Sequence, residues 1–597
     1  MYRLDEWWFP GRRLLVTLCG TLAIGVAPIA VSAPLHGTVT GEDGQPVSGY
    51  MLSIDDGQVE AGDVTVTVFT DAQGRYRTPD LGAGTALQVR GGTPGYAFAE
   101  APDGYLPLSA AKSSDEGLRL DIRVREADTP ELLPASAWLS QSADAHGRDM
   151  LVLHCTACHQ MPTEKIRGFA QHLYGLDEAQ RVQAWRAMVQ YMRIKVFEIG
   201  PEGSLINPDT VPFEVMSDPD NSLFNGYDEQ VIAEYMAKEV PTDYRSAEGY
   251  SVDHGPSAVT AETVIKEIHL PKTSLVREIA LTPKSDYLWG ADLQRNRLLR
   301  VDPDNPSEQV GYPVPYDKPT GPHTLIDDAE GYIWDGNVEG DVVFRFNPVT
   351  EEWQGYQFGP GSVVHDFAID DQFRVARDAD GHVWLTLIGK NKMGRLNTET
   401  GEVTEYDVPI EEDNTPFRAA IYGAVMTQTN KVWFSQLTGG VGALDAKTGE
   451  LVHWVDYPVG EGPRRMTIDS DDRIYVPLFG SGELSILDGN SGEEIKRVAL
   501  PDPASAPYSA VWDPWRNVVW LGTSNADVIY RYDVATDQIS HIPLPSRHGY
   551  LRMITFDRHN GNLWTAYSNM PAGSGPSAFI MVDPGDAPLT ASRVAGR

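Results

Sequence analysis

The sequence is poor in cysteine, in positive charge and in long apolar stretches, and each shortage narrows what the protein can be. Its 597 residues contain 48 Lys and Arg against 84 Asp and Glu, a formal net charge of -36. A chain this acidic does not bind nucleic acid or an anionic membrane through its overall charge. Beyond the N-terminal segment, no stretch approaches the roughly 18 apolar residues of a membrane-spanning helix. We therefore expect no stable membrane span after that segment.

The N-terminal segment has the features of an export signal. Two arginines precede the apolar run LLVTLCGTLAIGVAPIAV, and the small residues Val31-Ser32-Ala33 match a cleavage site. A membrane anchor is the alternative, but glycines and a proline interrupt the run. We predict a cleaved signal peptide over residues 1–33 and a periplasmic mature protein.

The scarcity of cysteine gives one short motif particular weight. The chain has 3 cysteines, and Cys19 would leave with the signal peptide. Cys155 and Cys158 remain, in the sequence CTACH that ends at His159. C-x-x-C-H is the attachment motif of a c-type haem. In an oxidising compartment spare thiols tend to pair, and haem thioethers would use both of these.

The alternatives for this motif are a redox disulfide and half of a zinc site. A zinc site would need two further ligands at matching spacing, and the sequence has no second C-x-x-C. We therefore predict one covalent haem c, held by Cys155 and Cys158, with His159 as the proximal iron ligand.

The region around the motif, 146–245, has helical periodicity. HGRDMLVLHCTACH predicts a helix that runs into the motif, EAQRVQAWRAMVQYMR has one apolar face, and DEQVIAEYMAKEV predicts a closing helix. This order resembles a class I cytochrome c domain. The W-x-x-x-V-x-x-M pattern that ends at Met192 resembles a helix of small cytochromes attached to dehydrogenases. Met192 is the first candidate for the distal iron ligand and Met216 the second; core packing is the alternative role of each.

Residues 34–125 combine turn signals with short alternating strands, such as VTVTVFTDAQGRYRTPDLGAG. The segment resembles the carboxypeptidase regulatory-like family, a small β-sandwich that implies a packing or adhesion module. The matching residues are Gly37, Val39, Gly44, Pro46, Val47, Thr70, Asp71, Gly74, Tyr76, Leu81 and Gly84. Residues 126–145 form a polar linker to the helical region.

The rest of the chain, 260–597, repeats. A Trp or Tyr stands in an apolar triplet after a turn at Trp289, Trp334, Trp384, Trp433, Tyr475, Trp520 and Trp564. The separations of 45, 50, 49, 42, 45 and 44 residues are typical of a β-propeller. Seven anchors predict a seven-bladed propeller. The strand at 263–269, ahead of the first anchor, is expected to complete the last blade and close the ring.

The repeated phrasing around these anchors resembles the virginiamycin B lyase (streptogramin lyase) family, which implies a seven-bladed propeller. The resemblance also implies a funnel His and Glu acting with Mg²⁺, the Glu coming from a W-F-T-E element. The matching fourth positions here are Asp292, Asn337, Leu387, Gln436, Leu478, Thr523 and Tyr567, and none is Glu. His323 matches an inner-strand His, and His365 and His548 lie near expected funnel entries, so a His–carboxylate general base is a second hypothesis.

Basic residues recur where the inner strands of the propeller are expected to start. Six of seven such positions carry one, from Arg277, His323, Arg374, Arg418, Arg464 with Arg465, and Arg552; the seventh carries Tyr508. A ring of guanidinium groups in a narrow funnel suits an anion. We take His323, Arg418, Arg465 and Arg552 as candidate catalytic residues. The alternative is that the arginines pair with carboxylates such as Glu278, Asp292, Glu339 and Asp366.

The sequence thus predicts a multidomain, mainly β protein: a small β-sandwich, an all-α cytochrome c domain and a seven-bladed β-propeller. We expect a periplasmic haem redox protein whose propeller binds a small organic anion or a partner, while the haem exchanges electrons with a redox partner protein. A second cofactor in the propeller has no motif. The alternatives are a metal-assisted lyase or hydrolase with an accessory haem, and a non-catalytic binding or sensing protein.

Overall fold

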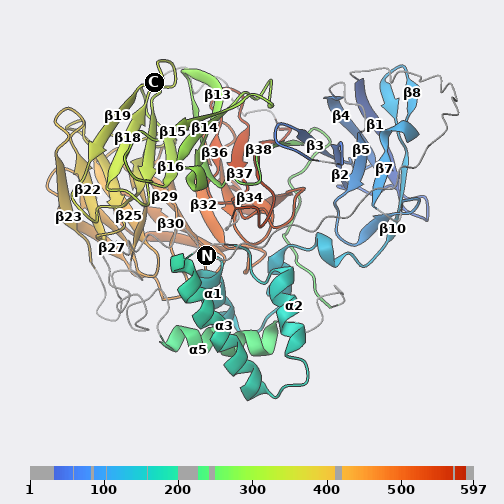
Figure 1. Ribbon diagram of the computed structural model, residues 1–597, viewed down its shortest axis with the longest axis horizontal. Coiled ribbons are helices and arrows are strands. Elements are labelled where there is room, and N and C mark those ends of the chain that lie inside the picture. Colours follow the sequence, from blue (N-terminus) through green and yellow to red (C-terminus); the bar gives the residue numbers. More distant parts are fainter. Residues whose placement is uncertain are drawn as a thin grey trace, which may run out of the picture.

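The computed structural model describes residues 33–57, 59–81, 87–101, 104–157, 159–198, 226–240, 249–409, 420–568 and 572–586. Residues 1–32 of the predicted signal peptide lie outside this part of the chain, as do Cys158, Met216 and Arg418. The described chain is a multidomain, mainly β protein with a β-propeller and a small region of four α-helices (Figure 1). The expected fold class is confirmed at this level.

Seven four-stranded blades, numbered 1 to 7, make up the described propeller; four of them are separate sheets, and the other three are parts of two eight-stranded sheets. Neighbouring strands within a blade are antiparallel, and blades 3 and 4 also touch through their inner strands, β20 and β24. In blade order the strands are β12 (Val276–Thr282), β13 (Ser285–Asp292), β14 (Arg297–Val301), β15 (Gln309–Pro313); β16 (Pro322–Asp327), β17 (Ile333–Asn337), β18 (Val342–Phe346), β19 (Trp353–Gln357); β20 (Val364–Ile369), β21 (Val383–Leu387), β22 (Lys392–Leu396), β23 (Val403–Asp407); β24 (Ile421–Met426), β25 (Lys431–Gln436), β26 (Val441–Asp445), β27 (Leu451–Val455); β28 (Thr467–Ile468), β29 (Arg473–Leu478), β30 (Glu483–Asp488), β31 (Glu494–Ala499); β32 (Pro507–Asp513), β33 (Val518–Thr523), β34 (Val528–Asp533), β35 (Gln538–Pro543); and β36 (Thr555–Phe556), β37 (Leu563–Ala566), β38 (Ala578–Asp583) with β11 (Val264–His269).

Each predicted aromatic anchor lies on the second strand of its blade and is buried. The rings fill the space between neighbouring blades: the centroid of Trp289 in blade 1 is 5.0 Å from that of Phe346 in blade 2. The centroid of Trp334 in blade 2 is 5.6 Å from that of Phe367 in blade 3. A large ring at this one position therefore ties each blade to the next, which explains the repeat in the sequence.

Strand β11 closes the ring, as predicted, and also joins the propeller to the N-terminal lobe. One edge of β11 pairs with β38, with Val264 opposite Asp583, and the other edge pairs with β3, with Val264 opposite Val68. The result is one eight-stranded sheet in the order β36-β37-β38-β11-β3-β2-β5-β7. The pairing covers both edges of β11, so neither is left open to other chains.

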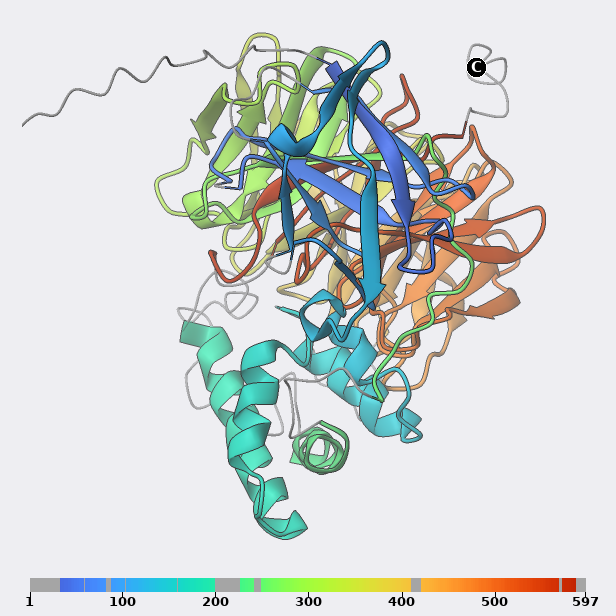
Figure 2. The ribbon, with the colours of Figure 1, turned by 90° about the vertical axis from the view of Figure 1, so that its right-hand side faces the viewer.

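The N-terminal lobe consists of two layers of short strands that stand beside the propeller (Figure 2). The second sheet has the order β6-β10-β1-β9-β8, and β4 also pairs with β1. The strands of the lobe are β1 (Ala33–Thr40), β2 (Met51–Asp55), β3 (Val64–Phe69), β4 (Arg75–Leu81), β5 (Gln88–Gly91), β6 (Tyr96–Phe98), β7 (Tyr105–Pro107), β8 (Lys112–Ser114), β9 (Gly117–Arg119) and β10 (Ile122–Glu126).

The helical region comprises α1 (Ala145–Cys155), α2 (Glu164–His172), α3 (Glu178–Glu198) and α5 (Gly226–Glu239). Side chains of Asp144 and Thr163 cap α1 and α2 by accepting hydrogen bonds from the backbone N–H groups of the first turns. The apolar core of the helices continues into loops of one propeller face, where Leu293, Val338 and Leu437 belong to the same buried cluster as Trp185. The helices therefore cover that face of the ring (Figure 1).

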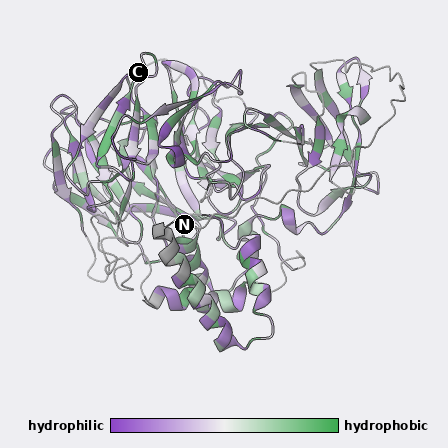
Figure 3. Ribbon diagram, viewed as in Figure 1, coloured by the Kyte–Doolittle hydropathy of each residue, from purple (hydrophilic) through white to green (hydrophobic). Residues whose placement is uncertain are grey.

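Polar and apolar residues are mixed along helices and strands alike (Figure 3). None of the helices within the described ranges is long and apolar enough to cross a membrane. The segment expected as a linker is packed against the propeller: Ala135–Trp138 is a buried turn of 3-10 helix, and the backbone N–H of Ser136 donates to Asn525 O at 3.0 Å.

Candidate functional site

The C-x-x-C-H segment follows directly from the last turn of α1. Cys155 ends the helix and is half-buried against the helical core. With its proton on Nδ1, His159 donates a hydrogen bond of 2.8 Å to the carbonyl oxygen of Gln160, which leaves Nε2 as the nitrogen that could bind a metal. Burial lowers the pKa of His159, so the ring is neutral at pH 7, the form that binds a metal. Cys155 and His159 therefore fit a c-type haem.

Helix α3 carries two methionines, Met188 and Met192, that are candidates for the distal iron ligand. Met192 lies on α3 and is half-buried. Trp185, Met188 and Val189 pack in the apolar cluster that also contains Cys155. Met188 is thus a third candidate. It lies one turn before Met192, the position at which the W-x-x-x-V-x-x-M pattern ends.

Hydrogen bonds tie the C-x-x-C-H loop to blade 7. The hydroxyl of Tyr550 donates to the carbonyl oxygens of Thr156, at 2.7 Å, and of Ala157. Nη1 of Arg552 donates to the Ala157 carbonyl at 3.1 Å. Both side chains precede β36, the inner strand of blade 7, so the loop lies where that strand begins.

Blade 6 holds the other end of the same loop. The side-chain amide of Asn525 accepts from Met161 N at 2.7 Å and donates to Met161 O at 2.8 Å. Nε2 of Gln160 donates to Asp527 Oδ1 at 2.6 Å. Because the N–H and the C=O of the buried residue Met161 are both hydrogen-bonded to Asn525, the backbone has one favoured position there. The loop therefore has a defined orientation on the propeller.

Below the loop, five polar side chains meet near the propeller axis. They are Glu278 on β12, His323 on β16, His365 and Asp366 on β20, and Arg465 just before β28. Arg465 contacts Glu278 through Nη1 and lies 3.3 Å from Asp366 Oδ2 through Nε. His323 Nδ1 is 3.7 Å from Glu278 Oε1. Because blades 1 and 5 are not neighbours, the contact between Glu278 and Arg465 locates this cluster inside the ring.

Two tyrosines connect this cluster to the C-x-x-C-H loop. The hydroxyl oxygens of Tyr422 and Tyr508 are 2.5 Å apart. The ring of His365 lies 3.8 Å from that of Tyr422, and the guanidinium of Arg552 lies 4.7 Å from the Tyr508 ring centroid. Arg552 also binds Ala157, so side-chain contacts are continuous from the loop to the histidines.

Burial sets the protonation of the cluster. It lowers the pKa of His323 and of His365 well below the ordinary histidine value, and nearby cationic side chains lower both further. Both imidazoles are therefore neutral at pH 7. Burial raises the pKa of Glu278 and of Asp366, and the adjacent Arg465 opposes that rise. The cluster thus contains two neutral imidazoles, which can accept protons, beside two carboxylates that both contact the guanidinium of Arg465.

The structure brings together His323, Arg465 and Arg552 of the predicted catalytic residues. The alternative prediction, that the arginines pair with carboxylates, is confirmed for Arg465 with Glu278 and Asp366. Arg464 donates to backbone carbonyls, at 3.1 Å for that of Leu437. The ring is therefore less positive than its count of basic residues indicates.

One predicted inner-strand position, that of blade 3, was wrong. Arg374 follows β20 rather than starting it, and it pairs with Asp370 at 3.1 Å. The inner strand of blade 3 begins at Val364, which puts His365 into the centre instead. The segment HDFAID, which ends in Ile-Asp like HTLID on β16, is the local sequence signal for this strand.

No protein-family profile and no curated protein matches the chain. Among solved structures, it is similar to virginiamycin B lyase from Staphylococcus aureus at 17% identity and a TM-score of 0.44, over 54% of this chain and 99% of that one. It is similar to a streptogramin B lyase at 17% identity and TM-score 0.44, over 54% and 97%. The WD40 repeats of RRP9 follow at 9% identity and TM-score 0.43, over 56% and 99%.

Proposed function

We propose that this protein is a periplasmic c-type haem redox protein, in which a small organic, anionic substrate is bound at the propeller centre and electrons pass through the haem to a redox partner protein. The observation that carries the proposal is the position of the C-x-x-C-H loop. Tyr550 and Arg552 bind its carbonyls, and Arg552 touches Tyr508 on the way to the central cluster. A redox group on this loop would lie directly against the polar centre of the ring.

Cys155 and Cys158 would hold the haem through thioethers, His159 would be the proximal ligand, and Met192 or Met216 the distal one. The haem, when bound, supplies one-electron transfer. The helical region would then be a cytochrome c domain, and the lobe β1–β10 a carboxypeptidase regulatory-like module that packs on the propeller.

The central side chains would handle the substrate and its proton. Neutral His323 can accept a proton, and Glu278 at 3.7 Å would stabilise the imidazolium that results. Arg464 and Arg552, which donate to backbone carbonyls in the described structure, would orient an anionic group, together with Arg418.

The experiment is anaerobic reduction of the haem-loaded protein by small organic acids, followed in the haem absorption bands. We expect His323→Gln to keep the haem spectrum and to lose substrate-driven reduction at least tenfold, because one base is removed. His559→Gln, an exposed histidine of blade 7, is the matched control and should behave as the wild type. A chain that carries no covalent haem after expression with a cytochrome c maturation system would refute the proposal.

A lyase of the virginiamycin B type is the second candidate, and the contact between His323 and Glu278 favours it, since a neutral imidazole beside a carboxylate can serve as a general base. An elimination reaction transfers no electrons to the haem. Product that forms from a substrate while the haem stays oxidised, and that requires His323, would support this candidate over the redox protein.

A further inference from the structure

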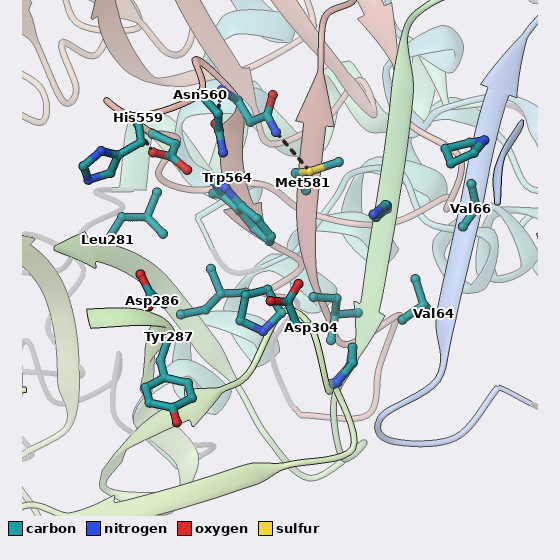
Figure 4. Close-up of a pocket in the computed structure, with 18 of the residues that line it drawn as sticks. Val64, Val66, Leu281, Asp286, Tyr287, Asp304, His559, Asn560, Trp564 and Met581 are labelled. Carbon is teal, nitrogen blue, oxygen red and sulfur yellow. Dashed lines mark hydrogen bonds between the residues drawn. The ribbon is translucent and has the colours of Figure 1, made fainter. Parts of the chain in front are cut away.

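A cleft of about 1030 Å³ lies between the N-terminal lobe and blades 1 and 7 (Figure 4). Its floor is a row of side chains across the joined sheet, from β2 through β3, β11 and β38 to β37. Ile54, Val66, Lys266, Met581 and Trp564 are successive register partners in this row, and all of them line the cleft. The floor is therefore apolar except for one lysine.

Four of the other six blades, blades 2, 3, 5 and 6, share one arrangement around the aromatic anchor, whereas the anchor of blade 1 donates to Ser285 and that of blade 4 to the carbonyl of Gly489. In blades 2 and 3, the indole Nε1 donates at 2.9 Å to an aspartate in the turn before the anchor strand. An arginine opposite the anchor, on the third strand, binds the same aspartate. The two sets are Asp328, Trp334 and Arg345, and Asp378, Trp384 and Arg395. Blades 5 and 6 also join an aspartate, an anchor and an arginine: Asp469, Tyr475 and Arg473, and Asp513, Trp520 and Arg516.

Blade 7 has the aspartate and the aromatic anchor but has no arginine opposite the anchor. Asp557 and Trp564 occupy the equivalent positions, and both line the cleft. The residue opposite Trp564 is Met581. The side chain of Trp564 is 6% exposed, and its buried Nε1 has no hydrogen-bond partner among the described residues. Arg558 donates to Asp327 and to the carbonyl of Gln372.

The charges around the opening favour a cation. Asp80, Asp286 and Asp304 line the cleft and are exposed, and Asp557 adds a fourth carboxylate. Lys266 and Arg558 are the cations of the lining, and Arg558 is paired with Asp327 outside it. The carboxylates therefore outnumber the available positive charge, which attracts a positively charged molecule and repels an anion.

We propose that this cleft binds an organic cation with an apolar body. Its ammonium or guanidinium group would take the place beside Asp557 that an arginine holds in blades 2 and 3. The apolar part would lie against Val66 and the exposed edges of Met581 and Trp564. The volume suits a small molecule, and a junction between two folded parts is a usual place for such a site.

The test is calorimetric titration of the whole protein with three probes of one shape: (1-naphthylmethyl)amine, 1-naphthalenemethanol and 1-naphthoate. We expect the amine to bind roughly two- to fivefold more tightly than the alcohol, the range of one partly exposed ion pair, and the carboxylate to bind least. Asp557→Asn should bring the amine to the level of the alcohol, because the specific carboxylate is lost.

Three variants separate this site from general charge attraction. Met581→Arg supplies the missing arginine internally and should abolish amine binding while leaving the melting temperature unchanged or higher. Lys266→Met should tighten binding of the amine, since one repelling charge is removed. Glu450→Gln, an exposed glutamate of blade 4, should change nothing. Absence of binding by all three probes, equal affinity for amine and alcohol, or preference for 1-naphthoate with loss in Lys266→Met would each overturn the proposal.

Discussion

Replacing Arg465 with methionine should destabilise the propeller strongly, and the reason lies in the two carboxylates it serves. The side chain of Arg465 is 3% exposed, that of Glu278 is 1% exposed and that of Asp366 is 6% exposed. Removing the guanidinium leaves two buried carboxylates with no cation between them. Breaking a buried ion pair by removing one partner costs about 3–5 kcal/mol.

For a propeller of about 320 residues, this loss corresponds to a melting temperature lower by about 4–7 °C, from an unfolding entropy of roughly 2.1 cal mol⁻¹ K⁻¹ per residue. The assay is differential scanning calorimetry. Lys496→Met is the control: Lys496 pairs with Asp537, and their side chains are 39% and 53% exposed, so we expect a loss of less than about 1 kcal/mol.

The deficit of Arg465→Met should also depend on pH. Burial raises the pKa of Glu278 and of Asp366, so the folded variant binds more protons than the unfolded chain. Stability then increases as the pH falls, and the difference from wild type should be larger at pH 8 than at pH 5. A variant that also carries Glu278→Gln and Asp366→Asn should recover part of the loss. A melting temperature within 1 °C of wild type, or a deficit that grows toward acid pH, would refute the reasoning.

Three further predictions concern other parts of the molecule. Tyr550→Phe removes the hydrogen bonds to Thr156 and Ala157, so amide exchange in the C-x-x-C-H loop should accelerate roughly fivefold, the equivalent of one such bond, by mass spectrometry. Trp185→Ala empties the helical core and should cost the helices about 3–5 kcal/mol, seen as an earlier loss of helical circular dichroism with the propeller transition unchanged. Burial lowers the pKa of His254 to about 3, so it opposes folding as the pH falls below about 6.5; His254→Gln should flatten the melting temperature between pH 6.5 and 4.5, and an unchanged slope would contradict this.

The main difference between the predicted and the observed propeller is the position along the sequence at which the inner strand of blade 3 begins. The aromatic anchors were predictable because each ring fills the same space between blades, so the chain repeats it every 42 to 50 residues. The inner strand of blade 3 was misplaced because Arg374 fitted a pattern of arginines, whereas backbone pairing places His365 at the centre. A local signal for the correct strand was nevertheless present, because HDFAID ends in Ile-Asp like the HTLID segment of blade 2.

The sequence by itself determined the propeller, its closing strand and the haem motif, because turns, period-two alternation and C-x-x-C-H are local patterns. Only the tertiary structure decided that β3 pairs with β11, that Tyr550 and Arg552 hold the C-x-x-C-H loop, and that Arg465 neutralises Glu278. These contacts join residues that are 187 to 395 positions apart. The physical reason is that such contacts depend on how whole sheets and helices pack, and packing leaves no periodic trace in either partner.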